Sequence, residues 1–156
     1  MARTTLRPIL LATLVAGTLD ILAAIGLSLF YGRDPMNMLR YVASGPFPGA
    51  TDWGQAGSAL GLAVHFGLMA IMAAIYVYAA ARVPALRAKP VQGGILYGLA
   101  TYVAMNLIVV PLRFGTPLPP PTRAIVTQLF CHIVLVGLPI ALIAARHLRN
   151  RSPFAR

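Results

Sequence analysis

Charge is scarce in this sequence. Only 10% of its 156 residues are charged, against about 25% in an ordinary soluble domain, and only three residues are acidic. Hydrophobic residues make up 58% of the chain, so its polar groups cannot cover a water-facing surface. These proportions exclude a soluble domain and indicate an integral membrane protein. The length fits one compact unit, 1–156, without room for a second domain.

Motifs of catalysis and cofactor binding are also missing. The sequence has no G-x-S-x-G, no P-loop, no H-E-x-x-H and no C-x-x-C-H. Its single cysteine, Cys131, excludes an intrachain disulfide and is expected to be a small buried hydrophobe. We therefore expect a protein that is not an enzyme, with no cofactor and no metal.

Basic residues are plentiful by comparison and give a net charge of +10. They lie at the ends of apolar runs, and no basic stripe follows a soluble element. This placement argues against nucleic-acid binding and is typical of a protein whose main partner is the lipid bilayer.

Four apolar runs are long enough to span a membrane. A helix crosses a hydrocarbon core of about 30 Å in about 20 residues, and the run Ala56–Ala81 has 26 without one charged side chain. The predicted spans are 8–31, 56–81, 91–112 and 124–145, which makes the fold an all-α, four-helix membrane bundle. Arg3 and Arg7 could open a signal peptide, but no convincing cleavage site precedes Asp20, so we expect the first span to be retained.

The one long polar connection, 32–55, contains the pattern of a short helix. Asp34 followed by Pro35 is typical of an N-cap and a first helical position. Apolar side chains then recur on one side: Met36, Leu39, Val42 and Ala43. We predict a short interfacial helix in this first outer loop.

Glycine and proline predict how the spans pack and bend. Gly57 with Gly61, and Gly94 with Gly98, have the G-x-x-x-G spacing that lets another backbone approach closely. This is more glycine than one small bundle needs, so we expect a homo-oligomer or a membrane-protein partner. Pro111 is expected to close the third span, and Pro139 to kink the fourth or loosen one turn.

One conspicuous polar residue lies deep inside each span: Asp20, His65, Asn106 and His132. At the helical rise, all four fall about 9–13 Å below the outer edge of the bilayer core. An ionised aspartate facing lipid costs about 2.5–3.5 kcal/mol, so Asp20 should face the bundle interior. We predict that the four converge, with Asp20 paired to His65 or His132 and Asn106 completing the cluster.

Such a cluster has three interpretations. It is the binding or proton-handling site of a small channel- or carrier-like protein, or it locks the helices of a structural or accessory subunit. As a third alternative, His65 and His132 could be axial haem ligands. The haem interpretation ranks last because no histidine pair shares a helix and no haem motif is present.

Several segments match a known pattern: HFGLMAIMAAIY from His65, Gln92-Gly93-Gly94, Pro111-Leu112, the proline-rich connection, CHIVLVG and RHLRN. Together they make His65 to Arg151 resemble the YagU-type family of uncharacterised bacterial inner-membrane proteins. The resemblance implies a four-span inner-membrane protein and no established reaction. The family can carry a histidine where this chain has Asn106, and Asp20 has no evident counterpart.

The basic residues also predict orientation. Nine belong to the N-terminal segment, the 82–90 turn and the C-terminal tail, and four belong to the two other connections. By the positive-inside rule both termini are cytoplasmic, in a bacterial inner membrane. Reporter fusions at Arg87 and Pro119 should therefore report cytoplasm and periplasm respectively. The reverse pattern, or a mature protein with a cleaved N-terminus, would contradict this topology.

Overall fold

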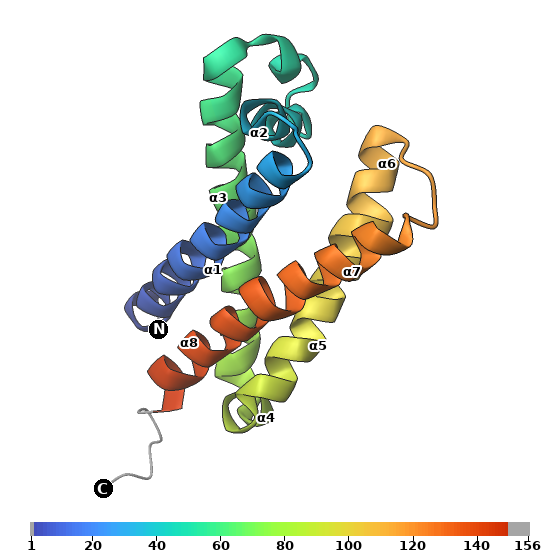
Figure 1. The fold of residues 1–156 in the computed structure, drawn as a ribbon. Coiled ribbons are helices and arrows are strands. Elements are labelled where there is room, and N and C mark those ends of the chain that lie inside the picture. Colours follow the sequence, from blue (N-terminus) through green and yellow to red (C-terminus); the bar gives the residue numbers. More distant parts are fainter. Residues whose placement is uncertain (1, 150–156) are drawn as a thin grey trace, which may run out of the picture.

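The fold was obtained as a computed structural model, which describes residues 2–149. Four helices in this range are long and apolar enough to cross a membrane: Thr5–Phe30, Gly54–Arg82, Pro90–Phe114 and Thr122–Leu148. The protein is thus an all-α, multi-pass membrane protein folded as a four-helix bundle (Figure 1). Each predicted span lies in one of these helices, apart from Tyr31. Arg151 and Arg156, which entered the basic count, lie outside the described residues.

The spans are built from helical segments in this order: α1 (Ala2–Phe30), α3 (Gly54–Arg82), α5 (Pro90–Tyr102) with α6 (Val110–Phe114), and α7 (Thr122–Phe130) with α8 (Leu138–Arg149). Helix α1 packs against α3 and α8, and α5 packs along the fourth span. The start of α1, the short helix α4 (Pro84–Ala88) and α8 lie at one end, called the α4 end (Figure 1). The opposite end carries α2 (Pro35–Ser44) and is called the α2 end.

Small side chains form much of the core. The fully or nearly fully buried cluster includes Ala12, Ala16, Ala73, Ala80, Ala141 and Ala144 from α1, α3 and α8. Alanine lets helices approach closely, which is how membrane helices gain van der Waals contact without a hydrophobic drive between them. Large apolar residues such as Leu14 and Leu22 point outwards instead, as a lipid-facing surface requires.

Two spans contain a wide, π-helical segment, Val103–Val109 in the third and Cys131–Gly137 in the fourth. Each ends two residues before a proline, Pro111 or Pro139. Proline has no N–H to donate and its ring clashes with the carbonyl four residues earlier, so the backbone ahead of it widens. The predicted loosening near Pro139 takes this form. The prediction that Pro111 closes the third span is wrong: the helix continues to Phe114 and ends at Gly115, whose φ is +63°.

Pro8, the first residue of the predicted span 8–31, is not the first residue of the helix. Helix α1 begins at Ala2, so Pro8 stands inside the helix rather than in its first turn. Further along the same helix, the Thr13 hydroxyl donates to the Ile9 carbonyl at 2.8 Å. Pro8 is itself fully buried, which places its ring in a packed contact of the bundle.

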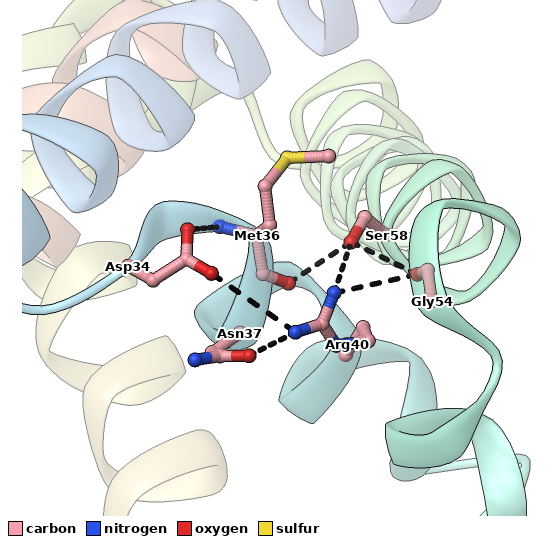
Figure 2. A network of polar contacts seen from close by, with 6 residues as sticks. All are labelled: Asp34, Met36, Asn37, Arg40, Gly54 and Ser58. Carbon is pink, nitrogen blue, oxygen red and sulfur yellow. Dashed lines mark hydrogen bonds and ion pairs between the residues drawn. The ribbon is translucent and has the colours of Figure 1, made fainter.

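Helix α2 forms as predicted, with the Asp34 carboxylate accepting from the Met36 N–H at 2.9 Å and Pro35 in the first turn. It docks on the start of α3 through a polar network (Figure 2). The Ser58 hydroxyl donates to the Met36 carbonyl at 3.0 Å. Arg40 donates to Ser58, to the Gly54 carbonyl and to Asn37, and lies 4.0 Å from Asp34. Helix α2 is therefore fixed on α3.

The two G-x-x-x-G glycine pairs pack against the backbone of other segments of the same chain. A side chain on Gly61 would strike the Leu39 carbonyl of α2, and one on Gly57 would strike the Ala50 carbonyl. Gly94 and Gly98 instead face the backbone of the Cys131–Gly137 segment. We expected an oligomer because the chain has more glycine than one small bundle needs. The paired glycines pack within the chain, so that expectation now rests on Gly26 and Gly67, which face open space.

Gly98 and Gly67 make a matched pair for testing this packing. Changing Gly98 to alanine places a Cβ 2.6 Å from the Ile133 Cα, a backbone atom that cannot rotate away. We expect Gly98→Ala to lower the free energy of unfolding by about 1–3 kcal/mol, as overpacking does. Gly67→Ala meets nothing of its own chain within 4 Å, so in the detergent-solubilised monomer it should be neutral or stabilise by up to about 1 kcal/mol. Thermal denaturation in detergent would measure both, and equal losses of stability would refute the contact.

Candidate functional site

The four polar residues predicted from the sequence come from four different spans. Asp20 lies on α1 and His65 on α3, while Asn106 and His132 lie in the two π-helical segments. The structure brings them together as two contacting pairs, Asp20 with His65 and Asn106 with His132. Asp20 is also within electrostatic range of His132. The two pairs are close enough to interact in this way but share no hydrogen bond or ion pair within residues 2–149, and together we call them the polar cluster.

His65 is held between α1 and the carboxylate of Asp20. Its ring is buried, and its Nε2 lies 2.9 Å from the Gly17 carbonyl oxygen. Its other nitrogen, Nδ1, lies 4.0 Å from Oδ2 of Asp20. That distance is too long for a direct hydrogen bond but lies within the range of an ion pair. Phe66 stands edge-on to the ring, with centroids 5.3 Å apart.

These contacts restrict where protons can lie. The Gly17 carbonyl can only accept, so Nε2 of His65 must carry a hydrogen. In a neutral ring Nδ1 would then be a lone pair facing the carboxylate of Asp20. A proton on Asp20 or on Nδ1 turns the repulsion between these two groups into attraction. The pair can hold that proton as a neutral acid beside neutral histidine, or as a carboxylate beside a histidinium.

Asn106 and His132 meet across the third and fourth spans. Nδ2 of Asn106 lies 3.4 Å from Nε2 of His132. A primary amide can donate with its nitrogen or accept with its oxygen after a half-turn, so this pair fits either tautomer of the ring. Among residues 2–149, Nδ1 of His132 makes no well-formed hydrogen bond and only a loose contact with the Gln128 carbonyl. His132 is therefore the less firmly held of the two histidines.

Metal coordination is a separate question from this polar cluster. Within the described chain, no group of three or more His, Cys, Asp or Glu side chains is arranged to hold a metal ion. Cys131, next to His132, is buried and unpaired, as predicted for a small apolar side chain. The chemistry that the cluster supports is proton binding and hydrogen bonding.

A cavity of about 350 Å³ lies between α1 and α7 at the α2 end, and the sequence analysis did not predict it. We call it the vestibule. Its lining includes Ala24, Ser28, Arg33, Arg123 and Gln128. Ala24 lies four residues beyond Asp20 on α1, and Gln128 four residues before His132 on the fourth span, so the vestibule opens about one helical turn from the cluster. In the sequence, only the four-residue spacings of Ala24 from Asp20 and of Gln128 from His132 could have indicated that a cavity lies beside the polar residues.

Comparison with known proteins adds no assignment. No family model, no curated protein and no solved structure matches the chain. The resemblance to the YagU-type family stays a prediction based on the residues given above.

The proton arrangement at His65 can be tested by ¹⁵N NMR of histidine-labelled protein in bilayers. The chain has three histidines, so His65→Gln identifies the signal. We expect His65 to be protonated at Nε2 in all forms, and at Nδ1 only when Asp20 is ionised. In Asp20→Asn, which removes the carboxylate, His65 should be neutral with Nε2–H alone. A neutral ring protonated only at Nδ1 would contradict the bond to Gly17.

Proposed function

We propose that this protein is a small channel- or carrier-like membrane protein, not an enzyme, whose polar cluster binds and passes protons. The observation that carries the proposal is the Asp20–His65 pair, in which Nε2 lies 2.9 Å from the Gly17 carbonyl oxygen and Nδ1 lies 4.0 Å from the Asp20 carboxylate. Two neighbouring groups that can each hold one proton, here the Asp20 carboxylate and Nδ1 of His65, are the smallest unit of a proton relay.

The surroundings of the pair support this function. Ionisable residues within membrane spans are costly and commonly mark proton or solute pathways. The Asp20 side chain is 19% exposed and that of His65 is 10% exposed, so the carboxylate is largely buried but still partly accessible. His132, within electrostatic range of Asp20, offers a second proton acceptor. Protons would thus pass between Asp20, His65 and His132, with Asn106 orienting the last ring.

Orientation and setting belong to the same proposal. The basic-residue count supports a bacterial inner membrane with both termini in the cytoplasm. The α2 end would then face the periplasm, and the vestibule would give access to the outer half of the bundle. The exposed Gly26 and Gly67 support contact with a second copy or a membrane-protein partner in the lipid bilayer.

One observation favours a structural or accessory role instead. The His65–Gly17 hydrogen bond ties α3 to α1 in either charge state of Asp20. Polar contacts between membrane helices contribute about 0.6 kcal/mol on average, so the cluster could serve packing alone. The two functions differ in whether the ionisable proton of Asp20 matters.

Asp20→Asn separates them, because it keeps shape and hydrogen bonding but removes the proton that titrates. In proteoliposomes loaded with a pH-sensitive dye, a potassium diffusion potential should drive proton entry through the wild type. We expect Asp20→Asn to reduce that flux to the level of protein-free liposomes while the protein keeps its thermal stability. Asp52→Asn is the matched control, since Asp52 lies at the surface near the start of α3, and it should conduct as the wild type.

Either of two results would reject proton handling. One is a wild-type flux no greater than that of empty liposomes. The other is an Asp20→Asn flux equal to that of the wild type. The second result together with unchanged stability would favour the structural or accessory role.

A further inference from the structure

We propose that the vestibule binds a small molecule through an anionic group, a phosphate or a carboxylate, held by Arg33 and Arg123. The volume of about 350 Å³ lies within the range of small-ligand sites, about 300–1,000 Å³. A larger adjoining hollow of about 730 Å³ shares Ser28, Arg33 and Met38 with the vestibule. Arg33 therefore stands where the two spaces meet.

The four arginines at the α2 end divide into two kinds. Arg113 donates to the carbonyls of Ser44 and Gly45 at 2.7 and 2.6 Å, which fixes the end of α2. Arg40 is occupied by the network that docks α2 on α3. Arg33 and Arg123 line the vestibule, and within residues 2–149 neither guanidinium forms an ion pair with a carboxylate. At this end, therefore, two arginines hold α2 in place, and two have no carboxylate partner within the described residues.

The vestibule has no negative charge of its own. Arg33 and Arg123 are the only charged residues of the described chain that line it. Asp34 lines the adjoining hollow, but its carboxylate already accepts from the Met36 N–H and faces Arg40. Both arginines are exposed at the mouth of the vestibule, where an incoming anion can reach them, and guanidinium binds carboxylate and phosphate with paired hydrogen bonds.

Arg123 is held in a suitable position. Its guanidinium carbon lies 4.2 Å from the ring centroid of Tyr31, so the aromatic face supports it. Stacking engages the flat face of the group and leaves its N–H edge free to donate. Gln128 and Ser28 supply neutral donors in the same cavity. The site thus combines charge with hydrogen-bond donors.

The position of the vestibule links this anion to the cluster beneath it. Ala24 and Gln128 of its lining each stand one turn from Asp20 and His132. An anion entering from the α2 end would meet the proton-binding residues next, as the coupled movement of an acid and a proton requires. That role as the transported solute rests on the proposed function, whereas the binding site itself does not.

The test uses the full chain in phosphatidylcholine nanodiscs, titrated by calorimetry with inorganic phosphate and separately with succinate. We expect at least one probe to bind and Arg33→Gln or Arg123→Gln to weaken it about tenfold or more, the effect of losing one charged hydrogen-bonding partner. Gln128→Glu adds a negative charge without altering either arginine and should abolish binding. Arg82→Gln, at the α4 end, is the matched control and should bind as the wild type.

A second arm distinguishes a soluble anion from a lipid headgroup. If neither probe binds, the protein is reconstituted with phosphatidylglycerol and retained lipid is measured by native mass spectrometry. Lipid retained by the wild type but lost in Arg33→Gln and Arg123→Gln assigns the site to a headgroup phosphate. Binding of none of these anions, or binding that both substitutions leave unchanged, overturns the proposal.

The anion site and the proton cluster can fail independently. Asp20→Asn should retain binding of the anionic probe, because Asp20 does not line the vestibule. Lost proton flux with retained binding supports both proposals. Lost binding in the arginine variants with no wild-type proton flux supports the anion site alone.

Discussion

A polar group inside a bilayer is costly unless it finds a partner within the protein, and this constraint explains most polar contacts of the bundle. It explains why Asp20 faces His65 rather than lipid and why His65 in turn reaches the backbone of α1. It also explains the wide segments before Pro111 and Pro139, where the chain accommodates carbonyls that proline cannot satisfy. The polar cluster and the π-helical segments both follow from the need to satisfy polar groups inside the bilayer.

Most of the fold could be predicted from the sequence because its signals are local. Runs of about 20 residues without charge define the spans, and Asp34 with Pro35 defines the start of α2. The four polar residues stood out for the same reason, as isolated polar side chains in apolar surroundings. Their number and approximate depth needed no knowledge of how the helices pack.

What the sequence could not supply depends on packing. Asp20 had two candidate partners, and the choice of His65 follows from the rotation of α1 against α3. The two arginines of the vestibule are indistinguishable in sequence from Arg40 and Arg113, since all four lie in the same two connections. Only the docking of α2 shows which are occupied. The sequence correctly predicted a close backbone contact at the G-x-x-x-G pair of α3. The contacting carbonyls, however, belong to Leu39 of α2 and to Ala50 rather than to another span.

The π-helical segments have a consequence for comparing this chain with other sequences. A wide segment holds more residues per turn than an α-helix, and one residue more or less in a helix rotates everything beyond it by about 100°. A relative with a regular helix in place of Val103–Val109 or Cys131–Gly137 would align only with a gap there. An ungapped alignment would pair the residue equivalent to Asn106 or His132 with a position on a different face of its helix. Gap placement, rather than overall identity, would then decide whether the site is recognised.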